Sequence, residues 1–472
     1  MKHIKTDLCI IGAGSGGLSI AAGAVQMGAD VVLLEGHKMG GDCLNYGCVP
    51  SKALIAAGKA AHALKEGEKY GVAKAVPQVD FSDVKAHVSN VIKTIEPHDS
   101  IERFEGLGVN VIQEYGRFIS PKEVQAGDTI ITARRFVIAT GSSPLVPPIP
   151  GLENVPYDTN ETIFEQLERP DHLLIIGAGP IGMEMAQAHH RLGCQVTVIE
   201  GAKALGNDDP ELAAIVLENL RAEGIEIAED ALASKIRGKS GAIEIETKDG
   251  RIFNGTHLLM AVGRKPNIEK LNLETAGIET GRGLVKVDAG LRTKNRKVYA
   301  VGDVASPLQF THVAGYHAGI VIRSALTLMP AKARTNHIPW ATYTDPELAQ
   351  VGPTEAQAHE KYGAKLEVLR FDFSGNDRLI TEGKARGLIK VMVVKGKPIG
   401  ASIVGPQAGE LISTWALVIA NGLKIGAVAA MVAPYPTIAE INKRVAGVYY
   451  TPRLFESDTV KRIVRAVQKW LP

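Results

Sequence analysis

The segment TDLCIIGAGSGGLSIAAGAVQMGADVVLLEG (residues 6–36) decides the fold class of this 472-residue chain. Its first apolar run, residues 8–11, is typical of a buried parallel strand. A glycine-rich turn, an alanine-rich stretch and a second apolar run follow, and this second run ends at Glu35. This order predicts a strand, a turn that binds phosphate groups, a helix and a second strand that ends at an acidic residue.

The same arrangement occurs again in DHLLIIGAGPIGMEMAQAHHRLGCQVTVIEG (residues 171–201). In both copies the first glycine precedes the acidic residue by 23 positions, from Gly12 to Glu35 and from Gly177 to Glu200. One G-x-G-x-x-G pattern alone is a weak signal, but two copies with matching strands, helix and acidic residue are a strong one. We therefore predict two Rossmann-like domains that each bind a dinucleotide.

Each position of the repeated motif has its own physical role. The first glycine permits a tight turn, the second lets the backbone approach a pyrophosphate, and the third lets the helix pack closely on the strand. The helix N-terminus supplies positive partial charge, and the acidic residue accepts hydrogen bonds from ribose hydroxyls. In this order the predicted residues are Gly12, Gly14, Gly17 and Glu35 in the first copy and Gly177, Gly179, Gly182 and Glu200 in the second.

The composition excludes several classes of protein. With 45% hydrophobic and 22% charged residues the chain is neither disordered nor fibrous, and its length corresponds to about three domains of ~150 residues. The 53 basic and 51 acidic residues give a net charge of +2, so no global field favours binding to nucleic acid. No glycine-poor apolar run has membrane-spanning length, so we expect a cytoplasmic protein.

The segment GGDCLNYGCVPSK, which follows the first motif, contains Cys43 and Cys48. On a regular helix, residues five positions apart differ by a rise of about 7.5 Å and a rotation of about 140°, too far for a disulfide. Asn45 and Gly47 permit a distorted turn that brings the sulfur atoms together, and Lys52 lowers the thiol pKa values. We predict a redox-active pair; the alternative is two free cysteines in a glycine-rich loop.

Taken together, these motifs resemble the pyridine nucleotide–disulfide oxidoreductases, a family that includes dihydrolipoamide dehydrogenase, glutathione reductase and mercuric reductase. The resemblance also rests on ATG (residues 139–141), AVGRKPN, YAVGD and YTDPELAQVGPTE, and it covers nearly the whole chain. It implies an α/β fold with two Rossmann-like dinucleotide-binding domains, a C-terminal α+β dimerisation domain and a homodimer. The implied division is an FAD-binding domain at 1–148, an NAD(P)-binding domain at 149–266, a second part of the FAD-binding domain at 267–337 and an interface domain at 338–472.

The resemblance also implies the cofactors. The first site is similar to the family's FAD site, to which Gly141, Gly302 and Asp303 contribute, and the second takes NAD(P)H. Glu200 would accept a hydrogen bond from a ribose 2′-hydroxyl and repel a 2′-phosphate, so we expect NADH to be preferred over NADPH. The alternative is that Lys203 binds the phosphate. No pair of histidines has metal-ligand spacing, so we expect no metal site.

The implied chemistry passes electrons from NAD(P)H through the flavin and a disulfide to an acceptor. In the family's pattern Cys48 is the sulfur beside the flavin, Cys43 exchanges with substrate, and Lys52 and Glu184 form a pair near flavin N5. His312 follows the second flavin motif, and either a flavin contact or a structural role is open. We expect His317 to be structural and His189 and His190 to be solvated on a helix face; these three form no part of the predicted site.

One segment departs from the family's pattern. Where members that act on dithiols and disulfides carry His-Pro-Thr and a downstream Glu, this chain reads APYPTIAE, with Tyr435 in the place of the His and Glu440 in the place of the Glu. A histidine with a pKa near 6.5 exchanges protons at neutral pH, whereas a tyrosine with a pKa near 10 does not. Tyrosine at this position resembles mercuric reductase, which reduces an inorganic ion, although that enzyme's C-terminal cysteine pair has no counterpart in this sequence.

Three functions therefore stay open. The first is a mercuric-reductase-like flavoenzyme with a small-molecule or ion acceptor, and the second is a dihydrolipoamide dehydrogenase with an unusual Tyr435. The third is a non-catalytic redox-sensing or membrane-associated flavoprotein. The last would use residues 459–471, which predict an amphipathic helix with one apolar and one basic face; we expect this helix to pack on its own protein, with a membrane surface as the alternative.

Overall fold

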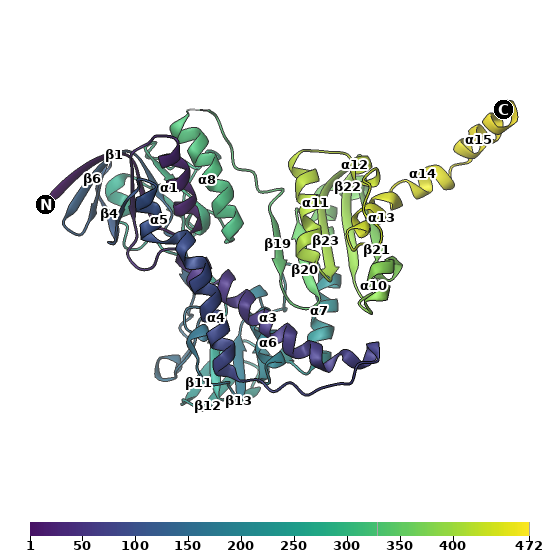
Figure 1. Cartoon of the computed structure of the whole chain (residues 1–472), viewed down its shortest axis with the longest axis horizontal. Helices are drawn as coiled ribbons and strands as arrows, with labels where there is room; N and C mark the ends of the chain where they lie inside the picture. The colour runs from purple at the N-terminus through teal and green to yellow at the C-terminus, as the bar shows by residue number, and fades with distance from the viewer. Residues whose placement is uncertain (328, 472) are drawn as a thin grey trace.

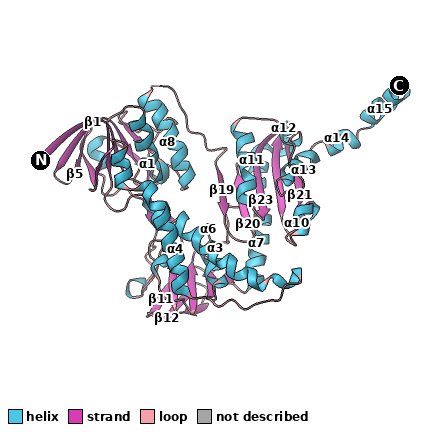
Figure 2. Ribbon diagram, viewed as in Figure 1, coloured by secondary structure: helices cyan, strands magenta, loops and turns pink. Residues whose placement is uncertain are grey.

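The computed structural model describes residues 1–327 and 329–471, in which three main sheets and some smaller ones have helices packed around them (Figures 1 and 2). The first glycine motif belongs to a seven-stranded sheet of order β3-β2-β1-β6-β5-β4, with β18 also paired to β6. The strands β2, β1, β6 and β18 run parallel, whereas β4 and β5 form an antiparallel extension. The strands are β1 (Lys2–Ile11), β2 (Val31–Leu34), β3 (Asn110–Ile112), β4 (Gly116–Ser120), β5 (Glu123–Ala126), β6 (Thr129–Ile138) and β18 (Val298–Ala300).

The helices around this sheet explain its apolar strands. Helix α1 (Ser15–Gln26) follows the glycine turn and packs beside α8 (Thr311–Leu326), so β2 is buried along its whole length. The cysteine segment forms the short helix α2 (Gly41–Asn45) and then α3 (Cys48–Lys65), which leads away from the first sheet towards the second (Figure 1).

The second glycine motif belongs to a four-stranded parallel sheet of order β10-β9-β8-β14. Helix α6 (Pro180–Arg191) follows its glycine turn and packs against α3, and α4 (Phe81–Ile95) also packs against α3. The strands are β8 (His172–Ile176), β9 (Gln195–Ile199), β10 (Glu226–Ala228) and β14 (His257–Met260), and the nearby helix is α7 (Pro210–Glu223). A small antiparallel sheet of β11 (Ala233–Lys239), β12 (Ala242–Thr247) and β13 (Ile252–Gly255) adjoins it.

Helix α6 is covered on more sides than its own sequence pattern indicates. His189 is buried, its Nδ1 donates to the Met185 carbonyl, and its ring lies against Phe81 of α4. The prediction that His189 is solvated is therefore wrong, because a helix from a distant part of the chain covers it. His190 is half-buried, and its Nε2 donates to the Glu223 carbonyl.

Two short strands connect the first and second sheets. β7 (Ser142–Pro144) leaves the first sheet directly after the ATG motif and pairs antiparallel with β15 (Arg264–Pro266), which leaves the second sheet within AVGRKPN. The segment by which the chain leaves the first sheet and the segment by which it leaves the second therefore lie side by side, and the ATG and AVGRKPN motifs adjoin each other there.

The third region is a five-stranded antiparallel sheet of order β19-β20-β23-β22-β21. Helix α11 (Ala408–Ala420) packs on it, and the buried Trp415 donates its Nε1–H to Asn442 of α13 (Glu440–Val448). The strands are β19 (Pro339–Thr342), β20 (Glu347–Val351), β21 (Leu366–Asp372), β22 (Leu388–Val394) and β23 (Lys397–Gly405). Two Rossmann-like sheets and a C-terminal α+β region confirm the predicted fold class.

The C-terminal segment extends away from this body. Helices α14 (Thr451–Phe455) and α15 (Asp458–Trp470) project beyond the third sheet (Figure 1), and no residue of α15 is buried. The expectation that this helix packs on its own chain is therefore wrong for the single chain. Among the described residues, no helix combines the length and the apolar character needed to cross a bilayer.

Candidate active site

A cavity of about 2180 Å³ joins the two glycine motifs and the cysteine segment. It exceeds the ~300–1,000 Å³ of a typical ligand pocket by a factor of two or more. Its wall contains the turns after β1 and β8, the α2–α3 segment and the start of α8. The predicted residues that line it are Gly12, Gly14, Glu35, Cys43, Cys48, Lys52, Gly141, Gly177, Gly179, Glu184, Glu200, Gly302, Asp303 and His312.

The first glycine of each motif makes the same turn. Gly12 has a φ of 106° and Gly177 a φ of 108°, in the left-handed region that favours glycine. A Cβ at Gly12 would lie 2.5 Å from the Ala139 carbonyl oxygen, and one at Gly177 would lie 2.4 Å from the Ala261 carbonyl oxygen. No other residue type fits either turn without a shift of the backbone.

The other glycines of the motifs differ in what surrounds them. A Cβ at Gly17 or Gly182 would lie 1.9 or 2.0 Å from the carbonyl oxygen of the turn, so these two residues seat the helix on the turn and do not line the cavity. At Gly14 and Gly179, by contrast, the position of a Cβ is open among the described atoms, with nothing nearer than 3.9 Å. Backbone N–H groups there are accessible to a phosphate.

The two acidic residues hold equivalent positions. Glu35 accepts hydrogen bonds from the N–H groups of Ala13 and His37, both at 2.8 Å. Glu200 accepts in the same way from Ala178 at 2.8 Å and from the N–H two residues after it at 2.9 Å. Each carboxylate is thus fixed at the end of its strand and keeps lone pairs free for ribose hydroxyls.

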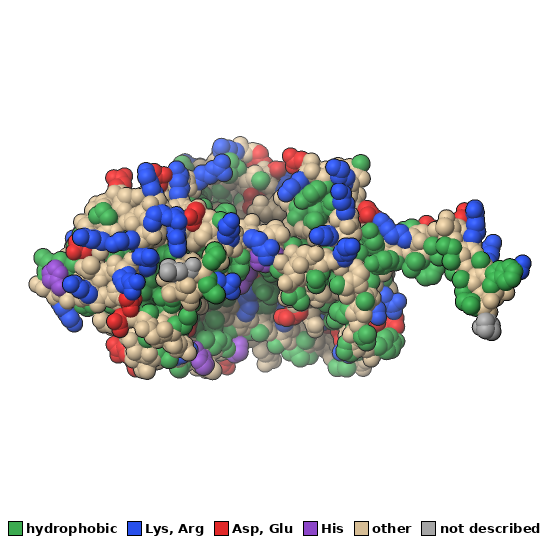
Figure 3. All heavy atoms as spheres, turned by 90° about the horizontal axis from the view of Figure 1, so that it is seen from above, with side chains coloured by type: hydrophobic (Ala, Val, Ile, Leu, Met, Phe, Trp, Pro, Cys, Tyr) green, Lys and Arg blue, Asp and Glu red, His purple; other side chains and the backbone are tan. Residues whose placement is uncertain are grey.

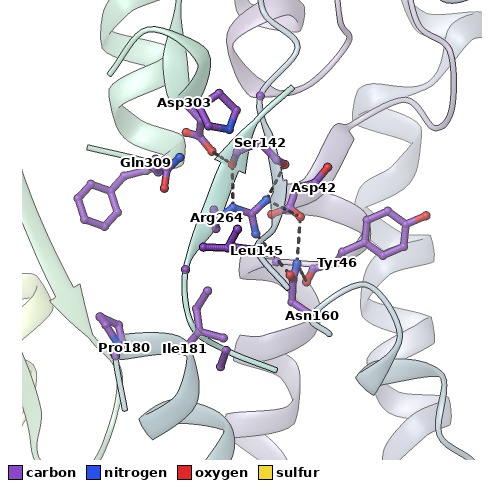
Figure 4. Close-up of a pocket in the computed structure, with 18 of the residues that line it drawn as sticks. Asp42, Tyr46, Ser142, Leu145, Asn160, Pro180, Ile181, Arg264, Asp303 and Gln309 are labelled. Atoms are coloured by element: carbon purple, nitrogen blue, oxygen red, sulfur yellow. Dashed lines mark hydrogen bonds and ion pairs between the residues drawn. The ribbon is translucent and has the colours of Figure 1, made fainter. Parts of the chain in front are cut away.

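Asp303 belongs to a hydrogen-bonded chain that crosses the cavity wall (Figure 4). Its Oδ2 accepts from the Ser142 hydroxyl at 2.6 Å, and burial raises the pKa of its carboxyl although that hydrogen bond opposes the shift. Arg264 donates from Nε to the Ser142 hydroxyl at 2.8 Å and reaches Asp42 at 3.0 Å. Asn160 donates to the same Asp42 oxygen at 3.0 Å.

These features fit FAD at the first site. The open backbone at Gly14, the N-terminus of α1 and the fixed carboxylate of Glu35 form a cradle for a pyrophosphate and a ribose. Apart from Gly141 itself and its two chain neighbours, nothing in the described chain lies within 4 Å of a Cβ built on Gly141, and Asp303 lines the same cavity. The second motif forms an equivalent cradle at Gly179 and Glu200 but has no counterpart of Gly141 and Asp303 among the predicted residues. This arrangement fits a nicotinamide dinucleotide.

Cys43 and Cys48 lie together across the break between α2 and α3, and both are free thiols in the structure. The Cys43 thiol donates a hydrogen bond to Cys48, and this contact outweighs burial and lowers the pKa of Cys48 to about 6. The Thr311 hydroxyl, 3.5 Å from the Cys48 sulfur, and the charge of Lys52 act in the same direction. The same hydrogen bond and burial raise the pKa of Cys43. When the pair loses one proton, Cys48 is therefore the thiolate and Cys43 remains the thiol.

Lys52 and Glu184 form an ion pair of 2.7 Å between α3 and α6. The Glu184 side chain is only 6% exposed, and its other oxygen accepts from the N–H of Tyr343 at 2.9 Å. Lys52 Nζ also lies 4.5 Å from the centre of the Tyr343 ring. Three separate regions of the chain therefore meet at this pair, beside the cysteines.

Tyr435 and Glu440 lie away from the cavity of their own chain. Tyr435 is 70% exposed, and its hydroxyl donates to Asp377 of α10 (Asp377–Thr381) at 2.9 Å. This hydrogen bond raises the pKa of the Tyr435 phenol, and the charge of Glu440 adds to the effect. The phenol is therefore a hydrogen-bond donor and not a base at neutral pH.

The two histidines near the second flavin motif differ in their surroundings. His312 lines the cavity, stacks on Phe310 at 5.3 Å and donates from Nε2 to the Pro339 carbonyl at 2.7 Å. His317 accepts from the N–H of Gly302 at 3.2 Å, and burial lowers its pKa to about 4. A neutral His317 thus supports the turn at Gly302, in line with the structural role expected of it.

Several residues at the site were not singled out from the sequence. Ser142 directly follows ATG and Arg264 lies within AVGRKPN, so both stand in motifs that had been noted. Thr311 and Tyr343 carry no such signal. They reach the cysteines and Glu184 only because α8 and the third sheet fold back onto the first two regions.

Comparison with known proteins agrees with this geometry. Residues 6–318 match the family model described as pyridine nucleotide-disulphide oxidoreductase, and residues 338–446 match that family's dimerisation domain. A mercuric reductase of Staphylococcus aureus is 36% identical over 442 residues, which cover 92% of this chain and 80% of the relative. A dihydrolipoyl dehydrogenase of Thermus scotoductus is 35% identical over 451 residues, with 92% and 95% covered.

A solved structure is similar over almost the same length. The Cu(II) complex of the HOCl-induced flavoprotein disulfide reductase RclA from Escherichia coli aligns with a TM-score of 0.83 at 26% identity, and the match covers 93% of this chain and 99% of that one. These matches confirm the resemblance inferred from the motifs, and with it FAD and NAD(P)H as the cofactors. The chain belongs to the pyridine nucleotide-disulphide oxidoreductases and is an FAD-dependent NAD(P)H oxidoreductase.

Proposed function

We propose that this enzyme uses NADH to reduce a thiophilic metal ion, with mercuric ion as the first candidate, at the Cys43–Cys48 pair. The observation that carries the proposal is the environment of Tyr435: an exposed phenol, bonded to Asp377, stands where dithiol-handling members have a histidine. A phenol with a raised pKa does not take a proton from a dithiol at neutral pH. An acceptor that needs no proton abstraction suits this site better.

The chain's own residues would hold the cofactors as follows. FAD, when bound, supplies hydride and electron transfer between the nicotinamide and the cysteine pair. The backbone at Gly14 and the N-terminus of α1 would hold its pyrophosphate, Glu35 would accept from its ribose and Asp303 would accept from its ribitol chain. The residues proposed for FAD are Gly12, Gly14, Gly17, Glu35, Gly141, Gly302, Asp303 and His312, and those for the nicotinamide dinucleotide are Gly177, Gly179, Gly182 and Glu200.

The cysteines have unequal roles in this proposal. Cys48, whose pKa is lowered to about 6, is the thiolate that stays beside the flavin, and Lys52 stabilises its charge. Cys43 is the sulfur that meets the acceptor. Glu184 positions Lys52 and fixes the backbone at Tyr343, so the cation keeps its place next to the thiolate.

Tyr435 and Glu440 act on a second copy of the chain. The dimerisation-domain match covers both residues, and neither lines the cavity of its own chain. We propose a homodimer in which they approach the cysteine pair of the partner. There the Tyr435 hydroxyl would donate a hydrogen bond to a thiolate or provide an oxygen to a bound cation.

The known relatives support an ion as acceptor. The Staphylococcus aureus relative is a mercuric reductase, and the RclA structure is a Cu(II) complex. For mercuric ion the balance is simple: one NADH gives two electrons, so that Hg²⁺ becomes Hg⁰ while NAD⁺ and one proton are released. Cys9 and Cys194 are buried, so within the described residues the ion would meet the thiols of Cys43 and Cys48.

The second candidate is dihydrolipoamide dehydrogenase. It is favoured by the relative from Thermus scotoductus, which is similar over 95% of its own length, and by Glu440, which keeps the position of the family's acid. The domain limits at 148, 266 and 337 belong to both candidates. The limits at 148 and 266 are supported by β7 and β15, which pair where the chain leaves the first sheet and where it leaves the second. The limit at 337 is supported by the dimerisation-domain match, which begins at residue 338.

A panel of acceptors tests the proposal. The purified holoenzyme is assayed with NADH and, separately, mercuric ion, cupric ion, lipoamide, glutathione disulfide, a quinone and oxygen, and acceptor-dependent NADH oxidation is compared as kcat/KM. We expect a metal ion to give the highest value. A higher value for lipoamide would replace the proposal by the second candidate, and activity with oxygen or quinone alone would reject both.

A further inference from the structure

No residue of the C-terminal helix α15 is buried, and the helix has one apolar and one basic face. Placed at about 100° per residue, its apolar side chains fall within an arc of about 120°. Ile463, Val464 and Trp470 of this arc are 57%, 51% and 78% exposed. Within the part of the chain that the structure describes, nothing buries them. The apolar face of α15 consists of Val460, Ile463, Val464, Val467 and Trp470, and Leu471 directly follows the helix.

The opposite face is mainly basic. Lys461, Arg462, Arg465 and Lys469 lie on it, and Asp458, in the first turn of α15, is the one acidic residue of this helix. Ion pairs are frequent elsewhere on this protein, but among the described residues none involves these four cations. Figure 3 shows Lys and Arg side chains and hydrophobic side chains together on the segment that projects from the body.

The position of the helix argues against a second copy of the chain as its partner. The match to the family's dimerisation domain ends at residue 446, before α14 and α15 begin. The helix also projects from the body of the chain beyond the third sheet (Figure 1). A protein surface that accepted this basic face would have to supply a set of carboxylates.

We propose that α15 binds the surface of a lipid bilayer that contains anionic headgroups. The apolar face, with Trp470 at its end, would enter the boundary between headgroups and acyl chains, and the four cations would meet the anionic headgroups. The helix would lie in the plane of the surface and leave the cavity of the enzyme in water. This binding is separate from the choice of electron acceptor.

Co-sedimentation of the full-length holoenzyme with lipid vesicles tests the proposal. The vesicles contain equal parts of phosphatidylglycerol and phosphatidylcholine, or phosphatidylcholine alone. We expect binding to the first kind, little binding to the second, and a fall in binding as salt is raised, because salt screens the cations. Equal binding to both kinds, or none to either, would overturn the proposal.

Two neighbouring substitutions separate the apolar face from the charge. Val467→Asp places a carboxylate in the apolar arc, and Gln468→Asp adds the same charge just outside it. We expect Gln468→Asp to lower the vesicle partition coefficient about fivefold, as one unit of charge does near an anionic surface, and Val467→Asp to lower it at least about fiftyfold. Equal losses in the two variants would contradict insertion of the apolar face.

Oligomeric state and activity complete the experiment. Both variants should keep the parent's sedimentation coefficient and its NADH oxidation with a soluble acceptor, since α15 contributes nothing to the cavity. If Val467→Asp instead dissociated an oligomer and the parent did not bind vesicles, the apolar face would belong to a second copy of the chain and the proposal would be overturned.

Discussion

Lys52 Nζ lies 2.7 Å from Glu184 Oε2, and the same Glu184 carboxylate accepts the N–H of Tyr343 at 2.9 Å. Helix α3 of the first region, helix α6 of the second and the chain after β19 of the third are thereby joined within hydrogen-bond distance of one side chain. The cation at this junction also faces Cys48, whose pKa it helps to lower. The Lys52–Glu184 contact that joins the three regions thus also places the cation that stabilises the Cys48 thiolate.

The first prediction concerns titration of the Cys48 thiol. In the reduced holoenzyme Cys48 should titrate with an apparent pKa of about 6, measured as the long-wavelength absorbance of its thiolate beside the flavin, which should increase as pH rises through that value and then level off. Thr311→Val should raise this pKa by roughly one unit, because it removes a donor to the thiolate. Thr311→Ser keeps the hydroxyl and serves as the control; an equal shift in both variants would contradict the assigned contact.

The second prediction concerns the two sulfur atoms. Two-electron reduction should produce long-wavelength absorbance from a Cys48 thiolate beside oxidised flavin. Cys43→Ser should show this band without reduction, whereas Cys48→Ser should abolish it while FAD stays bound. The measurement is an absorbance spectrum during anaerobic titration, and a band that survives in Cys48→Ser would reverse the assignment.

The third prediction concerns the nicotinamide cofactor. Glu200 is fixed at the strand end by two backbone N–H groups, and Lys203 is engaged with Asp230 at 2.6 Å, although both side chains of that pair are largely exposed. NADH should therefore give a higher kcat/KM than NADPH, since a 2′-phosphate would meet the Glu200 carboxylate. Asp230→Asn removes the ion-pair partner of Lys203, so that Lys203 can bind a 2′-phosphate. The ratio of kcat/KM for NADH to kcat/KM for NADPH should therefore be smaller in this variant. A preference for NADPH in the unmodified enzyme would refute this assignment of Glu200.

The fourth prediction concerns Tyr435. Tyr435→His should raise turnover with dihydrolipoamide by about tenfold or more, because a positioned acid–base group is worth roughly 10²–10⁴-fold. Tyr435→Phe, which removes the hydroxyl bonded to Asp377, should leave that turnover low. The measurement is steady-state reduction of NAD⁺. Brisk dihydrolipoamide turnover by the unmodified enzyme would contradict the proposed acceptor class.

The fifth prediction concerns stability. Lys390 is 3% exposed and binds Asp209, which is 1% exposed, at 2.9 Å, together with Glu355 at 2.8 Å. Lys390→Met would leave the Asp209 carboxylate buried without its cation, with only backbone N–H groups of α7 as donors, and should lower the free energy of unfolding by about 3–5 kcal/mol, measured by urea denaturation. The exposed Lys397→Met in the same hairpin is the control and should change it by less than about 0.5 kcal/mol.

The pH dependence of this cluster follows from the same contacts. Burial works against the charged amine of Lys390, but hydrogen bonds to Glu211, Glu355 and Asp209 outweigh it and raise its pKa. A raised pKa means that the stabilisation is complete below the unfolded value near 10.4 and is lost as pH rises through the folded one. The pKa of Glu211 is lowered, chiefly by its hydrogen bond to Lys390, so its contribution is lost as pH falls.

Local patterns in the sequence were sufficient for the two dinucleotide cradles. The turn at Gly12, the seat at Gly17 and the carboxylate of Glu35 all lie within one strand–helix–strand unit, where short-range geometry decides the structure. The same holds for Gly177 and its repeat. These parts could therefore be read from spacing and residue type alone.

Contacts between distant parts of the chain could not be read in this way. Ser142 reaches Asp303 and Thr311 reaches Cys48 only after the chain has passed through the second region and returned to the first sheet with β18 and α8. His189 was expected in solvent because nothing in its own helix shows that α4 lies over it. The prediction for helix α15 was wrong in the opposite sense. Its apolar face led us to expect burial against the same chain, but no residue of this helix is buried there.

The pairing of β18 with β6 has a consequence for synthesis of the protein on the ribosome. Ser142 and Asp303, which meet beside these strands, are 161 positions apart, and the whole second sheet is made between them. The nascent chain must therefore carry residues 136–138 of β6 with one edge unpaired until β18 emerges, although β5 already pairs with residues 129–132, while the inserted domain folds first. An open strand edge is a template for pairing with other chains. This enzyme is thus most exposed to aggregation midway through translation, and a stop after β14 would yield one finished domain attached to an unfinished one.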